Sequence, residues 1–259
     1  MEVRGRRFSY IHVPGPGVPV LMLHGFGGNA ATWLYNIPAL RRHGDIYALD
    51  IPGHGESFAD VGDPSYEGLT VSVNDFVNAV FSSNFHIVAH SLGAAIAIGI
   101  ALAHNEKVES LTLISCPGAR PDFNRQFFLD YMRAETVDDF AECLRHVVSS
   151  PEADLDALAR STMKFLSAPE YAEANRRIIM ANMSEEDIMK VPVGRIDEIE
   201  APVKLVWGRD DRITPVEHAA CFPDKVSVEY IDGVGHMPHL EAPGEVNEIL
   251  LSVLKQACS

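Results

Sequence analysis

The chain of 259 residues carries 36 acidic and 21 basic side chains, so its formal net charge is −15 at pH 7. A field of this sign repels phosphate backbones, and we therefore expect no nucleic acid as a partner. With 47% hydrophobic and 22% charged residues, the composition excludes a disordered or fibrous protein. At about 150 residues per domain, the length corresponds to about 1.7 domains.

The four cysteines are scattered without paired spacing, which disfavours a disulfide framework and a zinc site. No signal peptide is evident, because the apolar patch behind the N-terminal arginines is interrupted at Pro14. The longest apolar run, Leu92–Ala103, is too short to span a bilayer and predicts a buried helix. We therefore expect a soluble, cytoplasmic protein that does not associate with membranes.

Short apolar runs alternate with helical patterns over residues 1–118. The runs predict strands covered on both faces, at Val18–Leu23, Asp45–Asp50, Phe85–Ala89 and Ser110–Ser115. Helical patterns lie between these runs, in Asn29–Arg42, Thr70–Ser82 and Leu92–Asn105. At the start of the chain, Val3–Arg7 and Phe8–Val13 predict a small antiparallel pair on the sheet edge. Alternation of strands and helices in this way favours a parallel sheet.

Residues 119–200 have helical patterns and no convincing strand. Thr136 and Asp139 form a capping-box-like pattern ahead of an apolar helical face. Further helices are predicted to begin at Ser150–Glu152 and at Ser167–Glu170. An insertion of this length between two strands is more than a loop, and it could form a lid.

Strand and helix patterns return beyond the insertion, at Val203–Trp207, Val226–Ile231 and the amphipathic Glu245–Leu254. We therefore expect a discontinuous core domain of residues 1–118 and 201–259. The helical cap is expected to comprise residues 119–200.

Ser91 lies where a buried strand pattern runs directly into a helix pattern, and small residues flank it. A turn this sharp strains the serine backbone and projects its hydroxyl from the sheet. The first amides of the helix beginning at Leu92 point to the same place and favour a developing negative charge. Ser91 is therefore the candidate nucleophile, and the alternative is that it only caps the helix.

A serine hydroxyl needs a base to accept its proton, so a histidine must lie within reach. His236 follows a strand pattern in a glycine-punctuated loop, at the sheet edge where ligands bind, and His239 is its rival. The two could also form a metal pair, but no third ligand stands at suitable spacing, and we expect no metal. Three other histidines resemble surface residues: His43, His104 and His218.

The imidazole needs a carboxylate that fixes its tautomer, and the loop after Trp207 offers Asp210 and Asp211. Either aspartate could instead cap the helix that follows. The oxyanion of a tetrahedral intermediate needs amide donors. The glycine-rich loop after the first buried strand supplies one, so the backbone N–H groups of Phe26 and Leu92 could form an oxyanion hole.

Along the chain, the four elements occur in the order oxyanion loop, Ser91, Asp211 and His236. This order resembles that of the α/β-hydrolase superfamily. The likeness covers nearly the whole chain and is carried by His24-Gly25, the turn Asp50–Ser57, the serine corner, Gly208-x-x-Asp211 and Gly235-His236. The resemblance implies a mostly parallel sheet of the eight-stranded type flanked by helices, with the insertion as a cap. It also selects Asp211, three residues past Gly208, over Asp210.

One position departs from the family pattern, because Ala89 stands where a glycine is usual two residues before the serine. A single extra methyl group is a modest cost in a crowded turn, and Ser91 is retained as nucleophile. A serine at this corner also argues against haloalkane dehalogenases and epoxide hydrolases, which place an aspartate there.

The leading hypothesis is a cofactor-free serine hydrolase of the carboxylesterase type that acts on a small carboxylic ester. Ser91 attacks the carbonyl carbon, His236 acts as base and then as acid, and Asp211 orients the imidazole. The candidate substrate contacts are Phe26, His90, Phe127, Tyr131 and Met237.

Two alternatives remain open. The stretch Trp207–Arg212 resembles C–C bond hydrolases of the meta-cleavage kind, although Met237 stands where those enzymes tend to carry an aromatic residue. The other alternative is a ligand receptor or assembly partner with slow turnover or none.

Overall fold

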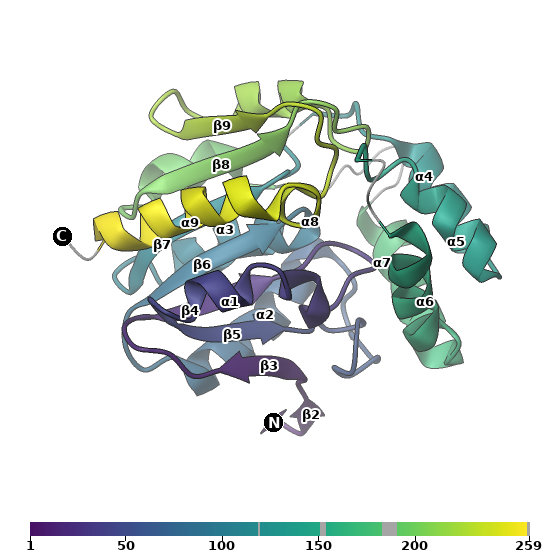
Figure 1. The fold of residues 1–259 in the computed structure, drawn as a ribbon. Coiled ribbons are helices and arrows are strands. Elements are labelled where there is room, and N and C mark those ends of the chain that lie inside the picture. The colour runs from purple at the N-terminus through teal and green to yellow at the C-terminus, as the bar shows by residue number, and fades with distance from the viewer. Residues whose placement is uncertain (119, 151–153, 183–190, 258–259) are drawn as a thin grey trace.

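The computed structural model describes residues 1–118, 120–150, 154–182 and 191–257, and its centre is a seven-stranded sheet of order β3-β5-β4-β6-β7-β8-β9 (Figure 1). The strands are β3 (Tyr10–Val13), β4 (Pro19–Leu23), β5 (Asp45–Leu49), β6 (Phe85–His90), β7 (Val108–Ile114), β8 (Val203–Gly208) and β9 (Ser227–Ile231). All neighbours in this sheet are parallel except β3, which pairs antiparallel with β5. The mostly parallel sheet is therefore confirmed.

The sheet has seven strands where the resemblance implied eight. Of the predicted N-terminal pair, the Phe8–Val13 strand lies at the sheet edge as β3, but its antiparallel partner is β5 and not Val3–Arg7. Residues Glu2–Val3 (β1) and Arg6–Arg7 (β2) pair with each other in a separate ribbon. The turn between them has Arg4 at φ 49° and Gly5 at φ 73°. Two positive φ values favour a tight hairpin, so the chain folds back on itself before the sheet begins.

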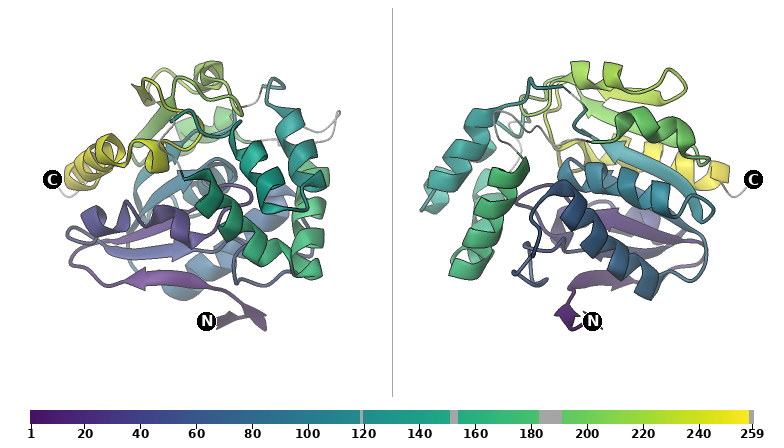
Figure 2. Two further views of the ribbon diagram at one scale, coloured as in Figure 1. Left: turned by 45° about the vertical axis from the view of Figure 1, so that its right-hand side comes forward. Right: turned by 180° about the vertical axis from the view of Figure 1, so that it is seen from behind.

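Helices cover both faces of the sheet (Figures 1 and 2). One apolar cluster contains residues of α2 (Tyr66–Val80) and α3 (Leu92–Ala103), and another contains residues of α1 (Ile37–Leu40) and α9 (Pro243–Ala257). Strand β4 contributes alternate side chains to the two clusters: Leu21 and Leu23 to the first, Val20 and Met22 to the second. This period of two is the signature of a strand buried on both faces.

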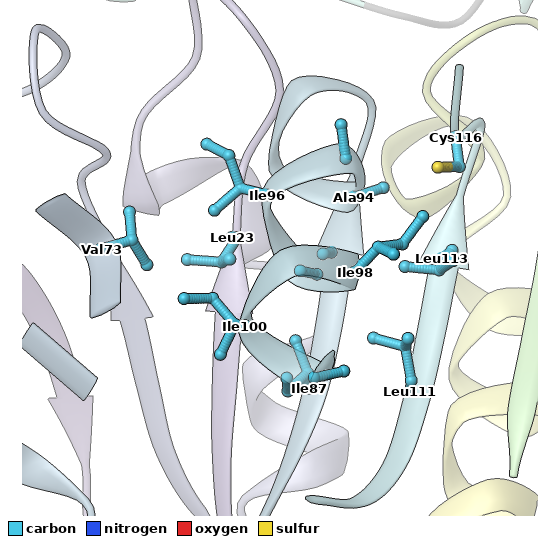
Figure 3. Close-up of a cluster of buried hydrophobic side chains, with 14 of the residues drawn as sticks. Leu23, Val73, Ile87, Ala94, Ile96, Ile98, Ile100, Leu111, Leu113 and Cys116 are labelled. Atoms are coloured by element: carbon cyan, nitrogen blue, oxygen red, sulfur yellow. The ribbon is translucent and has the colours of Figure 1, made fainter. Parts of the chain in front are cut away.

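Helix α3 has the bounds of the longest apolar run in the sequence. Figure 3 shows Ile96, Ile98 and Ile100 of this helix among side chains from the neighbouring strands, and all three are fully buried. A helix that is apolar all round belongs in a core, so the prediction of a buried helix is confirmed.

The helical insert lies between β7 and β8 in sequence, beyond the ends of the parallel strands that the arrowheads mark (Figures 1 and 2). Its described helices are α4 (Arg125–Arg133), α5 (Val137–Leu144), α6 (Leu155–Leu166) and α7 (Pro169–Asn182). The capping box is present, because the Thr136 hydroxyl accepts from Asp139 N and the Asp139 carboxylate accepts from Thr136 N. Asp154 caps α6. Of Ser150–Glu152, which were predicted to begin this helix, Pro151 and Glu152 lie outside the described residues.

Short helical turns complete the fold: η1 (Ala30–Trp33), η2 (Val193–Glu198), η3 (Val216–Cys221) and α8 (Pro238–Glu241). The segment Asn29–Arg42 is therefore two short turns, η1 and α1, and not one helix. Within the described residues, no helix is long and apolar enough to cross a bilayer.

Candidate active site

Ser91 stands at the corner between β6 and α3 with φ 50° and ψ −117°, a conformation that non-glycine residues rarely adopt. Its N–H donates to Ile114 O of the neighbouring strand at 2.9 Å, and its carbonyl accepts from Ala95 N at 3.1 Å. Such strain persists only where the surrounding structure over-determines it, and here the sheet and helix both hold the serine backbone. No hydrogen bond from the Ser91 side chain caps α3, so the capping alternative loses its support.

Two glycines let neighbouring backbone approach this corner. A Cβ atom on Gly93 would lie 2.4 Å from His24 O and 2.6 Å from Leu23 O. A Cβ atom on Gly25 would lie 2.6 Å from the Nδ1 atom of His90. A larger residue at either position would push the loop after β4 away from the serine.

The structure brings Ser91, His236 and Asp211 together. His236 Nε2 lies 3.0 Å from Ser91 Oγ, and His236 Nδ1 lies 2.8 Å from Asp211 Oδ2. The side chains of both His236 and Asp211 are buried. This arrangement can remove the serine proton, because the carboxylate holds the hydrogen on Nδ1 and leaves the Nε2 lone pair facing the hydroxyl.

The rival residues are placed elsewhere. His239 is fully buried, its Nε2 atom shares a hydrogen bond of 3.1 Å with Thr32 Oγ1, and its ring packs on Trp33. Asp210 is exposed. The predicted surface position of His218 was wrong: it is buried, and its Nδ1 atom accepts from Gly118 N at 3.0 Å. This bond ties η3 to the segment after β7, a tertiary pairing that local sequence does not reveal.

Asp211 is held by the turn that follows it. Its Oδ1 atom accepts from Ile213 N at 2.9 Å and from Thr214 N at 3.0 Å. Thr214 Oγ1 lies 3.2 Å from Asp211 Oδ2 and 3.3 Å from His236 Nδ1. Sequence reasoning missed Thr214; the spacing Asp-x-x-Thr after a strand, typical of an Asx-type turn, was the available signal.

The proposed oxyanion donors lie beside the serine. Leu92 is the first residue of α3, so its N–H has no partner within the helix. Phe26, Ser91 and Leu92 line one cavity together. His24 supports the loop of Phe26, because its Nε2 atom accepts from Ile51 N at 2.9 Å and its Nδ1–H donates to Gly25 O at 2.7 Å.

Glu241 is a second residue that sequence reasoning missed. Its carboxylate accepts from Gly235 N and Met237 N at 3.1 Å, on both sides of His236. It also accepts from Ser149 N at 2.6 Å and from Ser150 N at 2.9 Å, which belong to the helical insert. One side chain on α8 therefore joins the insert to the loop of the candidate base.

Further contacts reinforce that junction. His236 N donates to Val147 O of the insert at 2.7 Å. His90 Nε2 lies 2.8 Å from His236 O, and a neutral His90 with its proton on Nε2 donates there. Burial, followed by the neighbouring His239 and His236, lowers the pKa of His90 well below its usual value, so the ring stays neutral.

Two cavities meet at Ser91. The smaller, of about 40 Å³, is lined mainly by apolar side chains from the insert and the sheet edge. The larger, of about 510 Å³, lies against α4, α5 and α6. All five candidate substrate contacts line the larger cavity: Phe26, His90, Phe127, Tyr131 and Met237. Over the described parts of the chain, no cluster of three or more His, Cys, Asp or Glu side chains could hold a metal ion.

A family model described as "Alpha/beta hydrolase family" matches residues 20–249, nearly nine-tenths of the chain. The chain belongs to the alpha/beta hydrolase family. This membership confirms the resemblance, and the fold with its helical insert agrees with it.

Two curated proteins are similar in sequence to this alpha/beta hydrolase. The dihydrolipoyllysine-residue acetyltransferase component of the acetoin cleaving system of Pseudomonas putida is 28% identical over 260 residues, covering 98% of this chain and 68% of that protein. A 2-hydroxy-6-oxo-6-(2'-aminophenyl)hexa-2,4-dienoic acid hydrolase of Metapseudomonas resinovorans is 28% identical over 272 residues, covering 93% and 86%.

A similar solved structure is that of a membrane phospholipase A described as a bacterial virulence factor. It aligns with a TM-score of 0.85 and 25% identity, covering 100% of this chain and 86% of that chain. Proteins similar to this chain are thus named as an acetyltransferase component, a dienoic acid hydrolase and a phospholipase A.

We expect Glu241→Gln to lower kcat by about 10–100-fold with a smaller change in KM, because an error of about 1 Å in placing a reacting group can cost about 100-fold. Glutamine keeps one oxygen acceptor, but its NH2 group would face the backbone donors that the other carboxylate oxygen now satisfies. The rate at which a fluorophosphonate labels Ser91 and the turnover of a chromogenic hydrolase substrate measure the effect. Glu198→Gln, which removes an exposed ion pair to Arg195, is the control. A drop in melting temperature with unchanged kcat would reduce Glu241 to a structural role.

Stability should fall in mild acid. Burial lowers the pKa of His24 to about 4 and the pKa of His54 and His239 to about 3, against about 6.5 in the unfolded chain. Below pH 6.5 the unfolded state therefore binds more protons than the folded state. Each of these histidines should then reduce the free energy of unfolding by about 1.4 kcal/mol per pH unit, down to its folded pKa.

Urea unfolding at pH 7.5, 6 and 5 measures this slope. His54→Gln should lessen the slope, whereas the same change at the exposed His43 should not. A free energy of unfolding that is constant from pH 7 to 5 would contradict the assignment of neutral buried histidines.

Proposed function

We propose that the protein is a serine hydrolase that cleaves an uncharged carboxylic ester through an acyl-enzyme on Ser91. The observation that carries the proposal is the continuous contact from Ser91 Oγ through the His236 ring to Asp211, at 3.0 Å and 2.8 Å. The strained backbone of Ser91 supports the same role, since it exposes the hydroxyl beside the N-terminus of α3.

The proposed reaction has two half-reactions. Ser91 Oγ attacks the carbonyl carbon while its proton passes to His236 Nε2, and the backbone N–H groups of Phe26 and Leu92 stabilise the oxyanion. The bond to the alkoxy oxygen then breaks, and His236 returns the proton to the leaving alcohol. A water molecule, deprotonated by His236, then attacks the acyl carbon; the bond to Ser91 Oγ breaks, His236 returns the proton to Ser91, and the acid is released. Asp211 keeps its charge throughout and stabilises the imidazolium.

The charge of the cavities favours a neutral ester. Among the described residues that line them, Arg120 is the single lysine or arginine, and its guanidinium binds both carboxylate oxygens of Asp122 at 2.8 Å and 2.7 Å. The larger cavity is lined by Asp154 and Glu241. A substrate carboxylate would be desolvated there without a free cation to pair with.

The second candidate is C–C bond hydrolysis of a dienoic acid, which the 28% identity to the Metapseudomonas resinovorans hydrolase favours. The same pair of Ser91 and His236 could serve that reaction, because it also passes through attack at a carbonyl carbon. The two candidates differ in the charge of the substrate.

Ser91→Ala should lower kcat by roughly 10⁵–10⁶-fold without changing the fold, because the acyl-enzyme cannot form. Fluorophosphonate labelling followed by peptide mapping provides the direct measurement, and the expected site is Ser91. The exposed Ser252 of α9 offers the matched control, since Ser252→Ala should label and turn over as the parent does. Labelling at another residue, or activity of Ser91→Ala within tenfold of the parent, would refute the proposal.

A substrate panel should separate the two reactions. We expect p-nitrophenyl acetate and butyrate to be hydrolysed with kcat/KM at least about tenfold above p-nitrophenyl hemisuccinate, because the hemisuccinate would bury an unpaired charge. A vinylogous diketo acid should be cleaved poorly or not at all. Faster turnover of the diketo acid than of every ester would replace ester hydrolysis by C–C hydrolysis. Slow turnover of all of these compounds, with Ser91 still labelled, would favour a ligand receptor.

A further inference from the structure

The two cavities at Ser91 are unequal and divide the candidate site into two chambers. Both are lined by Phe26, Ser91, Phe128 and Ile213, so these residues mark the passage between them. The smaller chamber holds about 40 Å³ and the larger about 510 Å³. A substrate whose carbonyl carbon sits at Ser91 can therefore extend its acyl part into one chamber and its alcohol part into the other.

The position of the base decides which part enters which chamber. His236 lines the larger chamber and is absent from the lining of the smaller one. Because His236 must return a proton to the leaving oxygen, that oxygen and the alcohol attached to it have to lie on the side of His236. The acyl part is left with the smaller chamber, which Leu92 at the N-terminus of α3 also lines.

Resting on the serine hydrolase proposed above, we propose that the substrate class is an ester of a short, unsubstituted aliphatic acid with a bulky, uncharged, apolar alcohol. The substrate carbonyl lies at Ser91, the acyl chain in the smaller chamber and the alcohol in the larger chamber.

The size of the smaller chamber sets the length of the acid. A water-sized group requires about 10–15 Å³ of such volume, so about 40 Å³ accommodates about three groups of this size. This corresponds to acids from acetic to butyric. A longer chain would need side chains of the insert to move, and forcing extra methylene groups among packed apolar side chains costs free energy.

The polar groups of the smaller chamber are already engaged. The Oδ1 atom of Asn182 accepts from Tyr66 N, and its Nδ2 atom donates to Pro64 O and Ile178 O. These bonds use both hydrogens of the Asn182 amide group. Thr214 bonds to Asp211, and His218 accepts from Gly118 N. An acyl chain with a hydroxyl or amino group would therefore lose its hydration without gaining a free partner, so an aliphatic chain is favoured.

The larger chamber suits a bulky alcohol. Its volume of about 510 Å³ falls in the range of about 300–1,000 Å³ that is usual for drug-sized ligands. Aromatic rings of Phe127 and Tyr131 line it, and the Tyr131 hydroxyl already donates to Asn175 Oδ1 at 3.2 Å. Leu34 and Tyr35 also line it and are 57% and 65% exposed, so apolar surface continues from the chamber to solvent.

Two ester series test the assignment with one chemical group changed at a time. In the first, the alcohol is 2-naphthylmethanol and the acid runs from acetate through butyrate and hexanoate to octanoate. We expect kcat/KM to fall at least about tenfold beyond butyrate, since one methylene in a fixed apolar pocket is worth about 10–200-fold. In the second, the acid is acetate and the primary alcohol grows from ethanol to cyclohexylmethanol and 2-naphthylmethanol. Here kcat/KM should rise.

Variants locate the effect in the chain. Phe123 and Ile179 line the smaller chamber but not the larger, so Phe123→Ala and Ile179→Ala should each raise the octanoate-to-acetate ratio of kcat/KM by about tenfold. Leu158 lines the larger chamber but not the smaller. Leu158→Ala is the matched control, because it should leave the acyl ratio at the parent value and alter selectivity only in the alcohol series. Ile179 is buried, so Ile179→Ala could fail to fold. Phe123 is only half-buried, and its variant provides the same test with less risk to the fold.

The outcomes distinguish this proposal from the one it rests on. Preference for octanoate over acetate, with Ser91 labelled by fluorophosphonate, would overturn the chamber assignment and leave the serine hydrolase intact. The chamber assignment would also be overturned if Leu158→Ala changed the octanoate-to-acetate ratio while Phe123→Ala and Ile179→Ala left it unchanged. Absence of both Ser91 labelling and ester turnover would instead overturn the proposed function.

Discussion

The close approach of backbone at the end of β6 is the constraint on which the rest of the site depends. Gly93 and Gly25 allow the start of α3 and the loop after β4 to lie against the turn, and Ser91 is held there at a positive φ. The cost of that conformation, of order 1–3 kcal/mol, is offset by the packing of a buried strand and of a helix that is buried over most of its length. A less rigid core would let the serine relax away from His236.

A second constraint joins the helical insert to the sheet. The Glu241 carboxylate accepts hydrogen bonds from backbone N–H groups of the insert and from those on both sides of His236. Val147 O of the insert accepts from His236 N. The position of the candidate base and the position of the insert are therefore set by the same contacts. A change in the insert that moved residues 147–150 would reach the imidazole directly. The insert thus shapes the larger cavity and also helps to place the group proposed to do the chemistry.

The net charge of the whole molecule and the charge around the candidate site differ. The net charge of −15 belongs to the whole molecule, whereas the cavities at Ser91 are lined mainly by apolar side chains. Around them, buried histidines remain neutral because burial lowers their pKa values, as for His24 at about 4 and His239 at about 3. Because these histidines carry no charge, they do not oppose a proton on His236, and the Asp211 carboxylate contacts its Nδ1 atom directly.

The family, the mostly parallel sheet, the buried α3 and the candidates Ser91, Asp211 and His236 could all be predicted from the sequence. Strand periodicity, glycine spacing and the order of the motifs can be read from the chain without knowledge of its distant contacts. Only the folded structure revealed the burial of His218 and the hydrogen bonds that join Glu241 to the insert and to the loop of His236. It also decided the inequality of the two cavities at Ser91. These features depend on contacts between residues far apart in the chain, such as Glu241 with Ser149, and no local pattern encodes which distant backbone groups a side chain will meet.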